Sequence, residues 1–352
     1  MSAFKIEPKI LDAVSTDIPN SLHFLSNEEV LYPAGGVLTI HNIPHNTQTF
    51  ITVKCDPQKI INFVVVDPEK KFVSVACSAP EPVIEIYNLK KRHLTHHINI
   101  PAQLISMCYT WDGTHLLYVT SEESPTMYYY SFEQQKVESS TLAIQPPAYL
   151  GPVKMVAGNP ADSMIVVIVG SGLFRLLNLS DSLWRQYGFQ KAENYDFISV
   201  CWISAERIIA GTTDGRIILV DSGELKGIYR GYDVDVIIPT TNKEQLQIMT
   251  NKTMPKSNAA RKSILSVIGF AEGFLLVVAP NIIIVFKKDS ATRYAKKNEV
   301  ISRKVKVKYT IHDSIKNEIV SVSVSPDEKV ILCCTFQAQI YKTSLYRKDS
   351  EI

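Results

Sequence analysis

One pattern recurs seven times along the 352 residues: an apolar strand, a tight turn rich in Pro, Asp or Ser, a second apolar strand, a second turn and a third strand. The first turns of the repeats fall at Ser26, Pro68, Trp111, Pro160, Ser204, Ala271 and Pro326. The intervals between them are 42, 43, 49, 44, 67 and 55 residues. A four-stranded propeller blade repeats every 40–45 residues or so, so the sequence predicts an all-β, seven-bladed β-propeller.

The turns have the residue types that hairpins need. Residues 321–341 are typical: a Ser-Val-Ser-Val strand is followed by the turn Ser325–Lys329, a second apolar strand and a closing strand around Tyr341. Proline presets φ at the second turn position, and an adjacent Asp hydrogen-bonds the local backbone. One blade cannot bury both of its faces. Stacking the blades around an axis is the arrangement that leaves few open edges.

A single propeller accounts for the whole chain, residues 1–352. Propellers commonly close by pairing strands from the two chain ends, which removes an open edge. We therefore expect the N-terminal region, residues 1–20, to supply a closing strand, with residues 4–14 as the outer strand of the final blade. The ranges 233–263 and 287–316 are polar and longer than a tight turn requires. They are predicted to be long insertions.

Residues 264–286 contain one charge and are long enough to cross a bilayer as a helix. Glu272 near the centre and the Pro280-Asn281 break argue against a membrane helix. The segment also matches the repeat. We predict two buried strands joined by Ala271-Glu272-Gly273, and no membrane partner.

The six cysteines have no C-x-x-C spacing and fall mostly within predicted strands. Buried thiols in a reducing compartment explain this better than disulfides or a zinc site. The N-terminus has no positively charged region followed by an apolar stretch, so no secretory signal is predicted. Both features favour a cytoplasmic location.

No sequence motif of a known enzyme class is present. His93, His96 and His97 are close enough in sequence to suggest a metal site. No carboxylate or thiolate lies nearby in sequence to complete it, so a strand at the outer edge of a blade is the favoured interpretation. We expect no catalytic residues, no metal or other cofactor and no small-molecule substrate.

Charge is unevenly distributed along the chain. Residues 252–308 hold thirteen Lys or Arg and three Asp or Glu, a local charge of +10 that leaves −8 for the rest, given the overall +2. A basic segment on an acidic body attracts anionic partners. Equally, alternating lysines protect an exposed strand edge from aggregation. The candidate partner-binding residues are Lys296, Lys297, Arg303, Lys304, Lys306 and Lys308. Nucleic acid is disfavoured because no aromatic residues are interleaved for base stacking.

Several segments carry a family resemblance: Asn20–Phe24, Val30–Gly35, Gly170–Asn178, Gln190–Tyr195, Trp202, Ile209–Arg216 and Gly273–Pro280. With these residues the chain resembles the first WD-repeat propeller of the cilia- and flagella-associated WD-repeat proteins, most densely over 150–225. Family members carry a second propeller and a long coiled coil, which these 352 residues lack. The only Trp-Asp dipeptide, Trp111-Asp112, lies in a different turn from the family's.

The resemblance implies a WD40-type propeller with degenerate repeats that acts as a non-catalytic scaffold in the ciliary or flagellar axoneme. There it would place dynein-arm or regulatory complexes, with axonemal proteins, tubulin or dynein-associated complexes as partners, in the cytoskeleton. The alternative is a general cytoplasmic adaptor in trafficking, ubiquitin ligase or RNA-processing assemblies. Rigid rings with many exposed loops suit either role.

Overall fold

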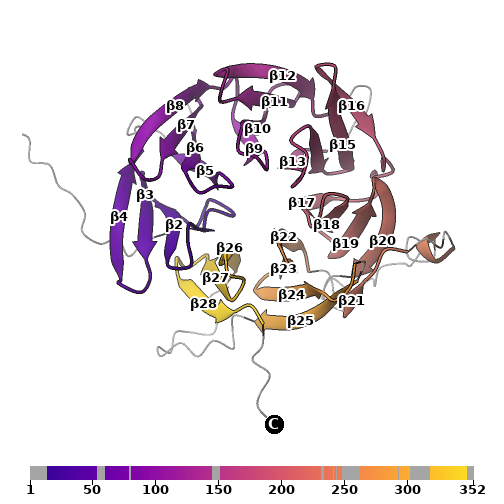
Figure 1. Ribbon diagram of the computed structural model, residues 1–352. Helices are drawn as coiled ribbons and strands as arrows, with labels where there is room; N and C mark the ends of the chain where they lie inside the picture. Colours follow the sequence, from indigo (N-terminus) through magenta and orange to yellow (C-terminus); the bar gives the residue numbers. More distant parts are fainter. Residues whose placement is uncertain are drawn as a thin grey trace, which may run out of the picture.

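Seven antiparallel sheets stand around a central axis in the computed structural model (Figure 1). The structure describes residues 14–53, 60–78, 81–144, 151–230, 234–240, 242, 244–247, 262–291, 293–301 and 318–346. The predicted fold class, an all-β seven-bladed propeller, is confirmed. Each of the seven predicted first turns lies between the first and second strands of a blade.

The strands are numbered along the chain, and each blade is built from consecutive strands. Blade 1 contains β1 (His23–Phe24), β2 (Glu29–Ala34), β3 (Val37–Asn42) and β4 (Thr47–Thr52). Blade 2 contains β5 (Ile61–Val66), β6 (Phe72–Cys77), β7 (Val83–Asn88) and β8 (His93–Asn99). Blade 3 contains β9 (Leu104–Tyr109), β10 (His115–Thr120), β11 (Thr126–Ser131) and β12 (Lys136–Leu142). Blade 4 contains β13 (Val153–Gly158), β14 (Ile165–Gly170), β15 (Leu173–Ser180) and β16 (Leu183–Tyr187).

The remaining blades follow the same order, with differences at their outer edges. Blade 5 contains β17 (Phe197–Trp202), β18 (Arg207–Thr212), β19 (Arg216–Asp221) and β20 (Glu224–Arg230). Blade 6 contains β22 (Ile264–Phe270), β23 (Gly273–Val278), β24 (Ile282–Lys288) and β25 (Tyr294–Ile301), to which β21 (Val236–Ile237) adds a fifth strand. Blade 7 contains β26 (Ile319–Val324), β27 (Val330–Thr335) and β28 (Ile340–Ser344).

The two ranges predicted as insertions are in part built into blade 6. Within 287–316, Tyr294–Ile301 form β25, which pairs with β24 along its whole length. Within 233–263, the short strand β21 pairs with the outer side of β25. Residues 248–261 and 302–317 lie outside the described residues, so for them the insertions stay a prediction.

Closure of the ring brings blade 1 against blade 7. The backbone N–H groups of Leu22 and Phe24 donate to the hydroxyls of Ser321 and Ser323, at 2.9 and 3.1 Å. Blade 7 has three strands among the described residues. Residues 4–13, most of the predicted closing strand, lie outside them, so that assignment stays a prediction.

Serine hydroxyls also join other neighbouring blades near the axis. Ser106 on β9 accepts from the backbone N–H of Val156 at 3.1 Å, and Ser199 on β17 donates to the carbonyl of Ile264 at 2.8 Å. The innermost strand of a blade has an unpaired backbone edge. The hydroxyls therefore satisfy backbone groups that would otherwise be buried without a partner.

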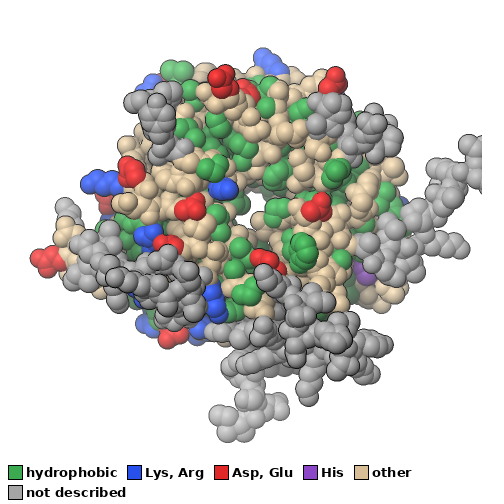
Figure 2. All heavy atoms as spheres, turned by 180° about the vertical axis from the view of Figure 1, so that it is seen from behind, with side chains coloured by type: hydrophobic (Ala, Val, Ile, Leu, Met, Phe, Trp, Pro, Cys, Tyr) green, Lys and Arg blue, Asp and Glu red, His purple; other side chains and the backbone are tan. Residues whose placement is uncertain are grey.

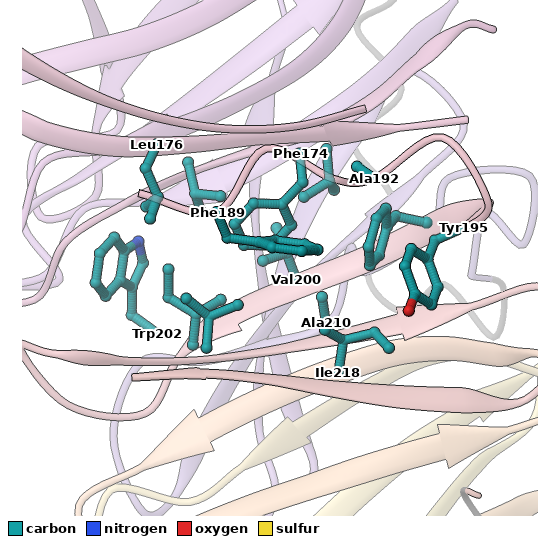
Figure 3. Packing of buried hydrophobic residues seen from close by; sticks show 14 of the residues in the cluster. Phe174, Leu176, Phe189, Ala192, Tyr195, Val200, Trp202, Ala210 and Ile218 are labelled. Atoms are coloured by element: carbon teal, nitrogen blue, oxygen red, sulfur yellow. The ribbon is translucent and has the colours of Figure 1, made fainter. Parts of the chain in front are cut away.

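Apolar side chains fill the wedges between adjacent blades. Between blades 4 and 5, Phe174 packs against Phe189, with ring centroids 5.3 Å apart (Figure 3). The ring of Phe197 packs against Phe174 at 5.5 Å. Burying an aromatic side chain of this size stabilises a fold by about 1.5–3 kcal/mol. Each wedge therefore fixes the angle between two blades.

The apolar segment 264–286 is confirmed as strands, because it forms β22, β23 and most of β24. Every residue of β23 is buried. Phe274 and Leu276 pack with residues of blade 5, whereas Leu275 and Val277 pack with residues of blade 7. Burial on both faces removes the polar alternation that marks a half-exposed strand. In the described part of the chain, no helix has the length and apolar character to span a bilayer.

One cysteine differs from the prediction. Cys77, at the end of β6, is disulfide-bonded. The prediction of thiols throughout is therefore wrong for this residue. Cys108, Cys201, Cys333 and Cys334 are free, and burial raises the pKa of the Cys201 thiol to about 11. Such thiols are protonated and unreactive at neutral pH.

Candidate interaction surface

The outer strand β25 carries the two candidate binding residues that the structure describes. Lys296 pairs with Phe286 and Asn298 with Val285, so Lys297 is the extra residue of a β-bulge. A bulge bends the strand and redirects a side chain. Lys297 is accordingly exposed, whereas Lys296 is partly buried, with its Nζ 3.9 Å from Oδ1 of Asp235.

Neighbouring cations on blade 6 have acidic or aromatic neighbours. Lys287 lies 3.9 Å from Glu272 and 5.1 Å from the centre of the Tyr346 ring. Arg293 forms an ion pair of 3.0 Å with Asp289. These exposed pairs contribute little to stability. Together they make the outer edge of blade 6 a mixed but mainly basic surface.

Four of the six candidate residues, Arg303, Lys304, Lys306 and Lys308, lie outside the described residues. The structure thus brings Lys296 and Lys297 onto one strand and leaves the wider basic segment as a prediction.

The axis of the ring contains a cavity of about 820 Å³. Figure 2 shows its opening at the centre of one face. The lining is mainly apolar, from the inner strands, and its titratable side chains include His23, Lys70, Lys154 and Glu328. Burial lowers the pKa of His23 to about 4, and its Nε2 lies 3.1 Å from the carbonyl oxygen of Val64. At neutral pH His23 is therefore an uncharged donor to the backbone.

The three histidines of blade 2 all lie on the outer strand β8. His96 packs edge-on against Phe132 at 5.5 Å. His97 lies 3.8 Å from the buried carboxylate of Glu85, a neighbour that sequence proximity did not indicate. Nowhere among the residues that the structure describes do three or more His, Cys, Asp or Glu gather as they would around a metal ion.

The segment that carries the strongest resemblance has a structural role in blade 5. The Thr212 hydroxyl donates to Asp214 at 2.6 Å and accepts from the backbone N–H of Arg216 at 2.8 Å. Arg216 lies 2.7 Å from Asp214 and its guanidinium stacks 4.5 Å from the centre of the Tyr195 ring. These contacts hold the β18–β19 turn in place. The presence of Thr212, Asp214 and Arg216 is therefore accounted for by the stability of the turn.

Sequence reasoning missed one set of surface residues. Trp111, Val137, Met164 and Leu183 are apolar yet exposed, all on blades 3 and 4. Periodicity assigns apolar residues to the core, so it gives no sign of an exposed group. The feature of the sequence that could have identified them is their position, because each lies in a turn or within two residues of one.

Comparison with known proteins adds to this geometry. No family model matches the sequence. The chain is similar to Cilia- and flagella-associated protein 57 of mouse (Mus musculus), with 23% identity over 357 residues. The match covers 93% of this chain and 28% of that protein, so the chain spans less than a third of the relative's length. This is a distant homology over most of the chain.

Solved structures define the fold type. A chain in the crystal structure of the mitotic checkpoint complex has a TM-score of 0.67 at 12% identity, covering 99% of this chain and 97% of that one. The fold is a WD40-type propeller. U3-55K gives a TM-score of 0.64 at 9% identity, over 92% of each chain. At such identities the likeness shows the fold alone.

Proposed function

We propose that this WD40-type propeller is a non-catalytic scaffold that binds other proteins in the ciliary or flagellar axoneme and helps to place dynein-arm or regulatory complexes there. The observation that carries the proposal is the homology to Cilia- and flagella-associated protein 57 over 93% of the chain. The similarity extends over most of the ring and is not confined to one blade. Turns and outer strands on a rigid ring suit simultaneous contacts with several proteins.

The basic edge of blade 6 is the proposed contact for an acidic axonemal partner such as the tubulin surface. Lys297 supports this assignment because the bulge of β25 exposes it. Arg303, Lys304, Lys306 and Lys308 would extend the positive charge along the chain. A cluster of like charges raises the rate of encounter with an oppositely charged surface, and salt weakens it.

Co-sedimentation with microtubules tests the basic contact. We expect the sixfold glutamine variant of Lys296, Lys297, Arg303, Lys304, Lys306 and Lys308 to pellet at least fivefold less than the unmodified protein, with K296Q/K297Q intermediate. The matched control is K90Q/K91Q in the exposed β7–β8 turn of blade 2, which should pellet normally. Equal pelleting of the sixfold variant and the unmodified protein would remove the basic-contact proposal.

The absence of catalysis is part of the proposal. It is supported by the mainly apolar lining of the axial cavity and by the fold, whose instances commonly act as binding platforms. Proximity labelling in ciliated and non-ciliated cells separates the axonemal role from a general cytoplasmic adaptor role. Enrichment of axonemal proteins in ciliated cells is expected. The same trafficking or RNA-processing neighbours in both cell types would favour the adaptor.

A further inference from the structure

Large exposed apolar side chains are concentrated on two adjacent blades. Of the eight such side chains among the described residues, five belong to blades 3 and 4: Trp111, Val137, Met164, Leu183 and Tyr187. Leu183 is 63% exposed, Met164 51% and Trp111 50%. Apolar side chains that gather on a surface rimmed by polar groups mark an interaction site, whereas scattered ones do not.

Four of these side chains lie on one face of the ring. Trp111 is in the first turn of blade 3, and Met164 ends the first turn of blade 4. Val137 is the second residue after the third turn of blade 3, and Leu183 directly follows the third turn of blade 4. In an antiparallel meander, the first and third turns lie at the same end of the sheet. The four residues therefore share that end of two neighbouring blades.

A partly buried aromatic cluster connects the two blades at this end. The ring of Tyr129 on β11 stacks on His115 with centroids 4.2 Å apart, and Trp184 on β16 meets its edge at 5.6 Å. The hydroxyl of Ser139 on β12 donates to the carbonyl of Ser182 at 3.3 Å. Aromatic contacts and a hydrogen bond across the blade junction hold the exposed residues in fixed relative positions.

The phenol of Tyr129 is also where the polar residues of this surface converge. Burial raises its pKa to about 12, a hydrogen bond with Ser163 opposes the rise, and the carboxylates of Asp112, Glu138 and Asp162 add to it. These polar residues are chain neighbours of the exposed apolar ones, as in Trp111-Asp112, Val137-Glu138 and Ser163-Met164. Apolar and acidic side chains therefore alternate over the same small area.

The charge of this area is negative. Five carboxylates, of Asp112, Glu133, Glu138, Asp162 and Asp181, lie in or beside the four turns, together with two cations, Lys136 and Arg185. Five negative and two positive charges leave −3. Arg185 lies 3.5 Å from Asp181, and His115 lies 3.3 Å from Glu138. A complementary ligand would be cationic as well as apolar.

We propose that this surface, here named the blade 3–4 patch (Trp111, Val137, Met164 and Leu183 with Asp112, Glu138 and Asp162), binds a short segment of a partner protein in which basic and apolar residues alternate. Apolar side chains of the segment cover those of the patch, and its Lys or Arg residues pair with the three carboxylates. The proposal deepens the scaffold function and rests on its protein-binding part, independently of the ciliary location. It gives the ring a negative docking surface on blades 3 and 4, apart from the basic edge of blade 6.

A peptide array tests the patch directly with the full chain. The array holds ten-residue peptides in which four Lys or Arg and four Leu, Val or Trp are placed in varied orders. A matched array replaces each basic residue by Glu. We expect at least tenfold stronger binding to the best basic peptides than to their acidic counterparts, measured afterwards by fluorescence anisotropy. Binding should weaken with salt.

Two variants separate the apolar contribution to binding from the electrostatic one. W111S/L183S should lower the affinity at least fivefold at every salt concentration, and E138Q/D162N should lower it at least threefold while reducing its salt dependence. F336S removes an equally exposed apolar side chain from the β27–β28 turn, the second turn of blade 7 at the other end of its sheet, and should bind normally. Circular dichroism confirms that each variant is folded.

Equal binding of the basic and acidic arrays, or unchanged affinity in both patch variants, would overturn the proposal. Concentration-dependent self-association that only the patch variants lose would also overturn it, because the occupant would then be a second copy. If the peptide assay supports the patch but proximity labelling finds no enrichment of axonemal proteins, the result would instead count against the ciliary location. The two proposals can therefore fail separately.

Discussion

The hydroxyl of Ser321 accepts a hydrogen bond of 2.9 Å from the backbone N–H of Leu22, 299 residues earlier in the chain. Both residues are buried where the inner strand of blade 7 meets the start of blade 1. Among the described residues, the ring is thus closed by contacts near the axis. The closure combines such buried hydrogen bonds with an apolar cluster in which Phe24 and Tyr32 of blade 1 pack with Leu332 of blade 7. The hydrogen bonds matter here because β1 is only two residues long.

Replacing Ser321 by alanine should weaken this closure. The N–H of Leu22 would be left buried without its partner, which costs about 1–3 kcal/mol. Urea unfolding should show this loss for S321A, whereas S124A, which removes an exposed hydroxyl from the β10–β11 turn, should change stability by less than about 0.5 kcal/mol. Equal stability of the two variants would mean that the hydroxyl is not needed for closure.

Removing the N-terminal region tests the predicted outer strand of blade 7. The described start of the chain is already attached to blade 1, since the N–H of Ser15 donates to the carbonyl of Pro33 at 2.8 Å. Deletion of residues 1–15 should lower the melting temperature of the whole domain by several degrees. Deletion of residues 1–3 leaves the predicted strand at 4–14 intact and should have no effect. Unchanged melting of the longer deletion would refute closure by this segment.

The blades could be predicted from the sequence because their inner strands are apolar and their first turns are distinctive. Pro68 and Pro326 mark two of those turns directly. The outer strands gave no comparable signal. Lys136–Leu142 has few apolar residues, because this strand is paired on one side and largely exposed to solvent. Tyr294–Ile301 has Lys-Lys-Asn-Glu at its centre in place of an apolar run. The whole of this second strand lies within the range 287–316 that the sequence predicts as an insertion.

The candidate surfaces were less predictable than the fold. The positive charge around Lys297 is visible in the sequence, but the bulge that exposes this residue depends on its pairing with β24. The blade 3–4 patch depends on contacts between blades. Tyr129 and Trp184 are separated by more than one blade repeat in the chain, and only the ring arrangement brings them to 5.6 Å. Local patterns do not contain that information.

The partly buried histidine of the axial cavity should make stability depend on pH. Burial lowers the pKa of His23 to about 4 from its ordinary 6.5. The hydrogen bond to the carbonyl of Val64 acts to raise this pKa, and the positive charge of Lys70 lowers it further. Below pH 6.5 the unfolded chain therefore binds a proton that the folded state does not. The contribution of His23 to the free energy of unfolding is fully present above pH 6.5 and is lost as the pH falls towards 4.

The H23Q variant isolates this effect. Between pH 7 and pH 5, the free energy of unfolding should fall by about 2 kcal/mol more in the unmodified protein than in H23Q. Urea titrations at several pH values measure the difference, and the amide of glutamine can still donate to the Val64 carbonyl. Parallel pH profiles for the two proteins would show that His23 does not titrate as its burial implies.

Arg175 on β15 is a buried cation that joins blade 4 to the chain leaving blade 3. Its Nη1 donates to the carbonyls of Leu142 and Ala143 at 2.5 and 2.9 Å, and its Nε donates to Oε1 of Gln186 at 3.0 Å. Burial lowers the pKa of the guanidinium. The planar group satisfies three acceptors at once, which a lysine ammonium at the same position cannot reach.

The loss of stability on substituting Arg175 should therefore depend on which residue replaces it. R175M leaves two carbonyls without their donor but removes a buried charge, and we expect a loss of about 1–3 kcal/mol. R175K keeps the charge with fewer hydrogen bonds and should be the less stable of the two. The control R185M, at an exposed position on the adjacent strand β16, should cost less than about 1 kcal/mol. Chemical denaturation of the three variants checks the order. A lysine variant more stable than the methionine variant would show that charge, and not the guanidinium geometry, holds this junction together.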